Sequence, residues 1–169
     1  MPIICNDNTN GCFTGPYYPR PIFQCCSGGS CGGPNTIVNP TRSEEWGFFV
    51  GASATVAQNQ ALPLTLNASA GTAVTQSDAT TVGLTAGSYQ VSFNVTASSA
   101  ANPMEFALEL NGTVLPYSIV TATGDSTNKT LSNSVIISVP TNATLRIVNL
   151  TAGNATATRS NLAATKLLT

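Results

Sequence analysis

Apolar and polar residues alternate along much of this chain with a period of two, the pattern of a strand with one buried face. In the clearest case Tyr89, Val91, Phe93, Val95 and Ala97 are separated by polar residues. The segment 104–110 repeats the pattern, with two glutamates on its polar face. No segment carries the sustained 3.6-residue period of an amphipathic helix. The pattern therefore predicts an all-β protein.

Turn signals divide the chain into short strands. Asn111 and Gly112 stand between two apolar runs, and a type I′ turn needs positive φ at both positions. Further strands are expected, separated by turns at 85–87 and 140–142, over 46–56, 62–66, 72–75, 79–84, 114–121, 130–139, 143–150 and 161–168. About ten short strands predict a sandwich, and a jelly roll is the type that fits best.

The first 45 residues have a different composition, rich in Gly, Pro, Asn and Cys. The segment 28–34 is dominated by glycine and predicts a flexible point, whereas Pro16, Pro19 and Pro21 favour an extended path. No hydrophobic period there is long enough for an independent core, and no Gly-X-Y repeat indicates a collagen stalk. We therefore expect a connector arm over 1–45 and a jelly-roll body over 46–169.

Five cysteines all lie in this arm, at Cys5, Cys12, Cys25, Cys26 and Cys31. Their spacing does not match the C-x₂-C pairs of a zinc ribbon, although a metal site stays open as an alternative. Disulfides within one chain are a second alternative, and they leave one thiol over because the number is odd. Disulfides between chains are favoured, each contributing about 2–4 kcal/mol, and they imply an oxidising location.

The arm also carries large apolar side chains that are unfavourable in water. Tyr17, Tyr18, Ile22 and Phe23 are predicted to dock onto another subunit, at about 1.5–3 kcal/mol for each well-buried side chain. Ile3 and Ile4 are predicted to dock as well, and they suit addition as a strand to an exposed sheet edge.

Charge and composition exclude several partners. Charged residues make up 8% of the chain, the net charge is −1, and the six basic residues are scattered, so nucleic acid is not expected as a partner. No apolar run approaches the length of a membrane span. The segment 1–5 lacks the charged and apolar regions of a signal peptide, so a removed signal or another export route is expected.

The residues that enzymes use are scarce. The chain has no histidine, which excludes histidine-based triads and removes the commonest ligand of catalytic zinc. Glu105 and Glu109 share a strand face at a spacing of about 13 Å, which is wider than the carboxylate pairs of glycosidases. We expect no enzymatic activity and no cofactor.

Five segments of the body carry a resemblance to a known family: 46–49, 82–93, 108–112, 134–139 and 143–149. They resemble the C-terminal domain of collagen-like exosporium glycoproteins of spore-forming bacteria, the BclA type. Those domains are similar in fold to the trimeric tumour necrosis factor and complement heads. The resemblance implies a homotrimer whose first and last strands are neighbours on the inner sheet. It assigns to the core or the trimer contact Trp46, Phe48, Phe49, Tyr89, Phe93 and Phe106.

A cysteine-rich arm in place of a collagen stalk resembles endospore appendage subunits, whose N-terminal connectors link successive subunits. The resemblance therefore implies an extracellular structural subunit on a bacterial spore surface, in the exosporium or an appendage. Its partner would be itself, first as a homotrimer and then as a helical or stacked fibre, with other spore-coat or tip proteins as further partners.

Three other hypotheses stay open. A lectin-like adhesin or receptor-binding module on the same fold predicts an exposed aromatic cluster in a body loop. Lys129 or Lys166 is a candidate for an isopeptide bond with an Asn and a carboxylate. Seven Asn-X-Ser/Thr sequons are expected by chance in so Asn- and Thr-rich a chain; they begin at Asn67, Asn94, Asn111, Asn128, Asn142, Asn149 and Asn154.

Overall fold

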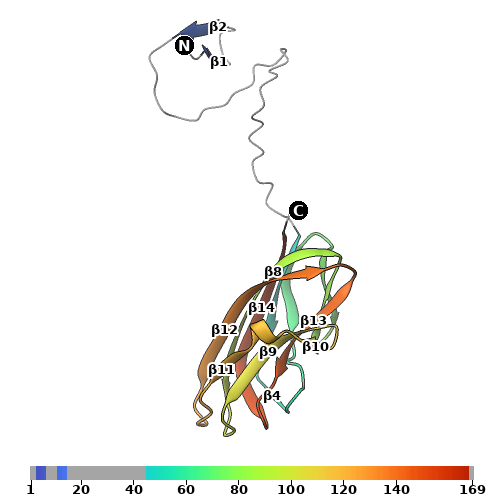
Figure 1. The fold of residues 1–169 in the computed structure, drawn as a ribbon, viewed down its shortest axis with the longest axis vertical. Coiled ribbons are helices and arrows are strands. Elements are labelled where there is room, and N and C mark those ends of the chain that lie inside the picture. Colours follow the sequence, from blue (N-terminus) through green and yellow to red (C-terminus); the bar gives the residue numbers. More distant parts are fainter. Residues whose placement is uncertain (1–2, 7–10, 15–44, 168–169) are drawn as a thin grey trace. The chain divides into compact units, whose positions relative to one another are not determined.

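The computed structural model describes residues 3–6, 11–14 and 45–167 (Figure 1). The chain divides into two compact units, residues 1–40 and 41–169. The predicted boundary between arm and body, after residue 45, lies a few residues further along the chain. Each unit is described by itself.

In the N-terminal unit, two strands form an antiparallel pair, β1 (Ile3–Asn6) and β2 (Gly11–Thr14). Their register places Cys5 opposite Cys12 and Ile4 opposite Phe13. The sequence analysis expected a connector arm here and did not single out this pair of strands. Ile, Cys, Phe and Thr favour strands, and four-residue runs were too short to register as a periodic pattern.

The body begins with a sheet that we call the long sheet. Its strand order is β12-β8-β14-β3-β5, and β4 adds to β14. The bounds are Lys129–Val139 for β12, Gly87–Ser98 for β8, Ala155–Leu167 for β14, Trp46–Gly51 for β3, Thr65–Ala70 for β5 and Ala54–Val56 for β4.

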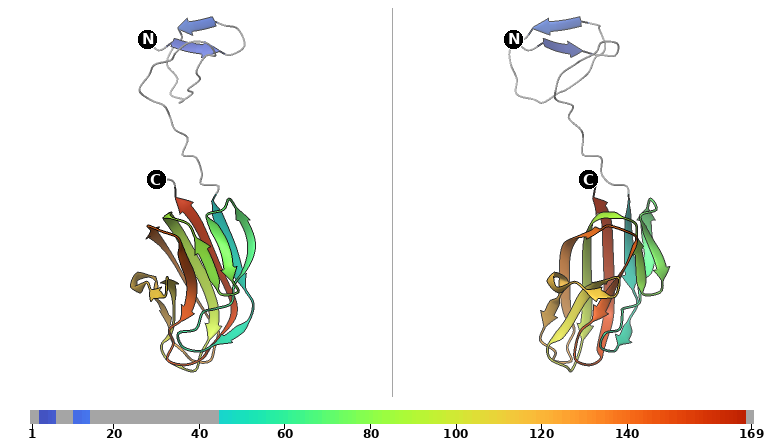
Figure 2. Two further views of the ribbon diagram at one scale, coloured as in Figure 1. Left: turned by 90° about the vertical axis from the view of Figure 1, so that its right-hand side faces the viewer. Right: turned by 45° about the vertical axis from the view of Figure 1, so that its right-hand side comes forward.

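A second sheet, the short sheet, faces the long one (Figure 2). Its strand order is β10-β9-β13-β7-β6, and β11 adds to β9. The bounds are Thr113–Val114 for β10, Met104–Leu110 for β9, Ala143–Asn149 for β13, Thr81–Leu84 for β7, Val74–Asp78 for β6 and Val120–Ala122 for β11.

Every pairing among the described strands is antiparallel, and the two sheets make the predicted all-β jelly-roll sandwich. The first and last strands of the body, β3 and β14, are hydrogen-bonded neighbours in the long sheet, with Phe49 opposite Leu162. This pairing of the first and last strands was implied by the family resemblance and is confirmed.

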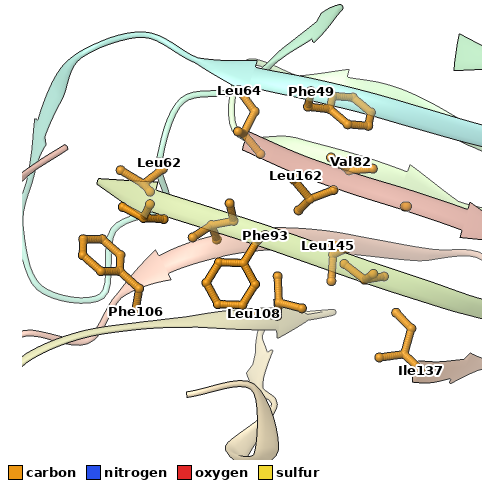
Figure 3. Packing of buried hydrophobic residues seen from close by; sticks show 14 of the residues in the cluster. Phe49, Leu62, Leu64, Val82, Phe93, Phe106, Leu108, Ile137, Leu145 and Leu162 are labelled. Carbon is orange, nitrogen blue, oxygen red and sulfur yellow. The ribbon is translucent and has the colours of Figure 1, made fainter. Parts of the chain in front are cut away.

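The core lies between the two sheets and is built from the apolar half of each alternating strand. Phe93 of β8 and Leu162 of β14 meet Phe106 and Leu108 of β9 there (Figure 3). All four side chains are buried. Burial of each contributes about 1.5–3 kcal/mol relative to exposure.

The turn predicted at Asn111 and Gly112 is confirmed. Both residues have positive φ, +50° and +78°, and they join β9 to β10. The side-chain Oδ1 of Asn111 accepts a hydrogen bond from the Thr144 backbone N–H at 2.8 Å, which ties the turn to β13.

The single strand predicted over 114–121 is wrong. Pro116 starts a short 3-10 helix, η1 (Pro116–Ser118), which separates β10 from β11. Proline has no N–H to donate to a sheet ladder, so the strand ends before it. No helix in residues 45–167 has both the length and the apolar character needed to cross a membrane.

The strand predicted over 62–66 is also misplaced, because β5 begins at Thr65. Leu62 and Leu64 are buried, but their N–H groups bond to two different partners, the carbonyls of Ile147 and Ala79. The alternating pattern therefore predicted the burial of Leu62 and Leu64 correctly, although these residues do not belong to a continuous ladder of strand hydrogen bonds. The strand predicted over 46–56 is likewise interrupted, between β3 and β4.

The last strand is longer than predicted. It was expected over 161–168, but β14 begins at Ala155 and its register shifts between Ala157 and Arg159. Ala and Thr alternate in its first half. They differ little in hydrophobicity, so their alternation is only a weak indication of a strand.

Candidate interaction surface

The long sheet has two unlike faces. Along β3, Phe49 is buried against the core, whereas its neighbours Trp46, Phe48 and Val50 point the other way. Successive side chains of a strand point to opposite faces, so the same division holds on β8, β12 and β14. We call the face away from the core the outer face.

Three rows of side chains cross this outer face, because the register aligns each strand with its neighbours. In the order β3, β14, β8 and β12, the rows are Val50, Asn161, Asn94 and Ser132; Phe48, Ala163, Ser92 and Ser134; and Trp46, Thr165, Gln90 and Ile136. None of these side chains is ionisable. These three rows of the outer face therefore present only amides, hydroxyls and apolar groups.

Trp46, Phe48 and Val50 form an apolar strip on β3, which we call the face strip. Trp46 is 36% exposed and Val50 is 38% exposed, while Phe48 is half-buried. Large apolar side chains left in water in a contiguous group mark an interaction site more often than an isolated one does.

A second apolar group lies at the β12 margin, and we call it the edge patch. Ile136 of β12 is 67% exposed, Tyr117 of η1 is 59% exposed, and Ile119 is 38% exposed. The η1 helix lies beside β12, where the Asn133 side-chain amide donates a hydrogen bond to the Tyr117 carbonyl at 3.3 Å.

Between the two apolar groups lies an open groove of about 500 Å³. It is lined by Phe93 and by six residues with amide or hydroxyl side chains: Ser92, Asn94, Ser132, Asn133, Ser134 and Asn161. Such a surface offers neutral hydrogen-bond donors and acceptors but no charge.

Among residues 45–167 the charged side chains lie outside these three rows, although Arg159 of β14 shares the outer face with them. Glu109 and Arg146 form an ion pair across β9 and β13 of the short sheet. Asp125, in the loop before β12, pairs at 3.0 Å with Lys129, the first residue of that strand. Arg159 lies on β14 opposite Thr96, beyond the three uncharged rows.

Hydrogen bonds explain the two perturbed carboxyl groups. The Thr127 hydroxyl, followed by Lys129, lowers the pKa of Asp125 to about 2. The backbone N–H of Thr80 lowers the pKa of Asp78 from its usual value. Both groups hold turns together at the surface, and neither faces the groove.

The six aromatic residues assigned to the core or the trimer contact fall into two groups. Phe49, Tyr89, Phe93 and Phe106 are buried between the sheets, where the Tyr89 hydroxyl donates to the Thr85 carbonyl at 3.0 Å. Trp46 and Phe48 lie on the outer face. The sequence did not single out Val50, Tyr117, Ile119 or Ile136. The only available signal was that Ile136 interrupts the polar half of an alternating strand.

The arm residues are described only in part. Ile3, Ile4 and Cys5 lie in β1, and Cys12 lies in β2. Outside the described residues lie Tyr17, Tyr18, Ile22, Phe23, Cys25, Cys26 and Cys31. Their docking and disulfide roles stay predictions.

The polar candidates of the body have ordinary partners. Glu105 accepts a hydrogen bond from the Thr121 hydroxyl at 3.1 Å, and Glu109 pairs with Arg146. Lys166 donates to the Thr85 hydroxyl at 3.3 Å. The isopeptide hypothesis for Lys129 and Lys166 stays a prediction.

Several solved structures are similar in fold to this body. Eiger, a tumour necrosis factor from S. frugiperda, matches with a TM-score of 0.60 and 12% identity, covering 75% of this chain and 94% of that one. Murine APRIL matches with a TM-score of 0.58 and 10% identity, covering 73% and 100%. The globular domain of zebrafish complement 1qA matches with a TM-score of 0.53 and 9% identity, covering 73% and 98%.

The body has the tumour necrosis factor and C1q fold. No protein-family model matches the chain, and no curated protein matches it. At these identities the likeness concerns the fold, so function must be argued from the surface.

Proposed function

We propose that the protein is a structural subunit that assembles with copies of itself on a bacterial spore surface. In this proposal three bodies form a homotrimer, and the N-terminal arm links trimers head to tail into a fibre. The observation that carries it is the three uncharged rows on the outer face of the long sheet, with exposed apolar groups at both of their sides.

Burial of that face favours association. Within residues 45–167, the exposed large apolar side chains are Trp46, Val50, Tyr117, Ile119 and Ile136, and all five belong to the face strip or the edge patch. Removing such side chains from water contributes about 1.5–3 kcal/mol each when burial is complete. The amides and hydroxyls between them find partners at low cost, because no charge has to be desolvated.

The arm supports the step from trimer to fibre. All five cysteines lie in the first 31 residues and none in the body, so disulfide crosslinking is separated from the packed core. A cyclic trimer contact closes on itself, whereas a head-to-tail contact repeats without limit. Disulfides between chains then prevent dissociation of the fibre.

Electron microscopy of the purified full chain tests the fibre. We expect filaments under oxidising conditions that resist boiling detergent. A variant with all five cysteines replaced by Ser should give filaments that dissolve, or separate trimers. Isolated globules in both redox conditions would contradict the proposal.

The proposal includes no catalytic role. Glu105 and Glu109, the pair weighed for glycoside hydrolysis, are each engaged with a neighbour in the short sheet. The chain also has no histidine. Localisation on the spore exosporium or an appendage, with coat or tip proteins as further partners, belongs to the same proposal.

A second candidate function is a glycan-binding or receptor-binding module on the same fold. The groove lined by Asn94, Asn161 and serines favours it, because neutral amides and hydroxyls suit sugar hydroxyl groups. A glycan array separates the two functions. Binding that is lost in Asn94→Ala would support the adhesin, and a blank array would leave the structural role.

A further inference from the structure

We infer that the Gln76 side chain caps the edge strand β5 and keeps it from pairing with the β5 strand of another copy. In the order β12-β8-β14-β3-β5, β5 is the strand at one end of the long sheet, with β3 as its neighbour. The inference goes beyond the proposed fibre, because it concerns an association that the chain avoids. It does not depend on which contacts the other surfaces make.

The sequence of β5 gives this strand little protection of its own. Its six residues, Thr-Leu-Asn-Ala-Ser-Ala, include no charged residue and no proline. Edge strands are normally protected by such residues, by bulges or by a covering segment, because their free N–H and C=O groups can bond to another chain. The register of β5 shifts at Asn67, so the irregular part lies beyond Thr65 and Leu66. The start of the strand therefore needs another cover.

The most suitable partner for an unprotected β5 is a second copy of the same strand. Two identical edges can pair in the antiparallel sense about a twofold axis, where each contributes the same residues. The absence of charge on β5 means that no like charges would meet across such a pair. Association of this kind would join molecules sideways, through a surface remote from β12 in the strand order.

The side chain of Gln76 occupies the backbone groups at the start of β5. Its Nε2 donates a hydrogen bond to the Leu64 carbonyl at 3.0 Å, and its Oε1 accepts one from the Leu66 N–H at 2.7 Å. The Leu64 N–H bonds to the Ala79 carbonyl, also at 2.7 Å. A side-chain amide has a donor and an acceptor, as a peptide group has. Gln76 therefore supplies the hydrogen bonds that an added strand would supply.

The place of Gln76 in β6 supports this role. Val74, two residues earlier, is buried, so Gln76 points to the same side of the strand, towards the long sheet. Its register partner on β7 is the buried Val82. An apolar residue would continue this pattern, but only an amide can bond to the β5 backbone. A bulge between Gln76 and Asp78 interrupts β6 itself, and bulges protect an edge from pairing.

Analytical ultracentrifugation of the full chain in reducing buffer tests the cap. Gln76→Ala removes both hydrogen bonds and should associate, with a weight-average mass at least twice that of the wild type at equal concentration. Thr75→Ala, at the exposed neighbouring position of β6, is the matched control and should keep the wild-type mass. Far-UV circular dichroism checks that both variants fold. If Gln76→Ala does not fold, Gln76→Asn replaces it, because its shorter amide cannot span both backbone groups.

A second substitution locates the contact. Asn67→Lys adds a charge to β5, and charge on an edge strand disfavours pairing with another chain. The double variant with Gln76→Ala and Asn67→Lys should therefore return to the wild-type mass, although the lost hydrogen bonds are not restored.

Two results would overturn the inference. A folded Gln76→Ala chain with the wild-type mass would show that Gln76 is not a cap. A double variant that stays associated would show that the new contact does not involve β5. A wild-type chain that forms neither trimers nor fibres would contradict the proposed function alone, since each variant is compared with the wild-type mass.

Discussion

At the scale of single residues, backbone conformation and a few hydrogen-bonded carboxylates determine which substitutions the body tolerates. Gly71 has φ of +71°, and a Cβ there would come within 2.5 Å of the Glu45 carboxylate. That carboxylate accepts hydrogen bonds from the N–H groups of Thr72 and Ala73 at 2.9 and 2.5 Å. Glu45 thus closes the turn before β6, and glycine leaves it room.

Gly71→Ala should destabilise the body by about 2–3 kcal/mol, since a left-handed alanine costs about 1–2 kcal/mol and the carboxylate must also move. Gly112→Ala is the matched control, because Gly112 has φ of +78° but open space around its Cβ position. Urea unfolding measures both. Equal losses for the two variants would show that contact with Glu45 does not matter.

Asp125 gives a prediction about pH. Its pKa is lowered to about 2, first by the Thr127 hydroxyl. Because the folded pKa lies below the unfolded value, its contribution to stability is complete above about 3.8 and is lost as the pH falls towards 2. Thr127→Val should raise the pKa of Asp125 in an NMR titration, whereas Thr127→Ser should leave it low. A pKa unaffected by Thr127→Val would contradict the assigned cause.

At the scale of strands and turns, the sequence predicted best where alternation was strong and a turn had a specific chemistry. The strand around Phe93 and the turn at Asn111 and Gly112 were both found as expected. Prediction failed where hydrogen bonds are set by distant neighbours. Leu64 is buried, yet its N–H bonds to Ala79 and not to a ladder partner. No local sequence pattern indicates which carbonyl such an N–H group bonds to.

The face strip shows the same limit for the candidate site. Alternation shows that Phe48 and Phe49 point to opposite faces, but not which of the two faces the core. That choice depends on the short sheet, which is built from residues far along the chain. The edge patch is harder still, since it depends on the packing of η1 beside β12, two elements that are separate in the sequence.

The turn at Asn111 provides a test at this scale. Asn111→Ala should cost about 1–2 kcal/mol, because alanine is strained at positive φ and Thr144 loses its hydrogen-bond acceptor. Asn111→Asp keeps an acceptor and tolerates this conformation, so it should cost less. Thermal unfolding of both variants compares them. An alanine variant as stable as wild type would argue against the role of the turn.

At the scale of the whole molecule, the absence of charge from the three rows of the outer face predicts how the proposed assembly responds to the medium. Ion pairs at the surface weaken with salt, because the Debye length shrinks from about 10 Å at 0.1 M to about 3 Å at 1 M. The three rows of the outer face contain no ion to screen. We expect an assembly built on these rows to respond only weakly to external salinity.

We therefore expect the trimer dissociation constant to change less than about threefold between 0.1 and 1 M NaCl. Analytical ultracentrifugation in reducing buffer measures it. Ile136→Lys, which places one charge at the edge patch, should weaken association and make it salt-dependent. A strong salt dependence in the wild type would indicate that the paired charges of the short sheet form the contact.

The pairing of β3 with β14 has a mechanical consequence. Because these antiparallel neighbours begin and end the body, Trp46 lies opposite Thr165, and both chain ends leave from the same pole. A pull between residues 45 and 167 loads their hydrogen bonds one after another, so the pair unzips under small force.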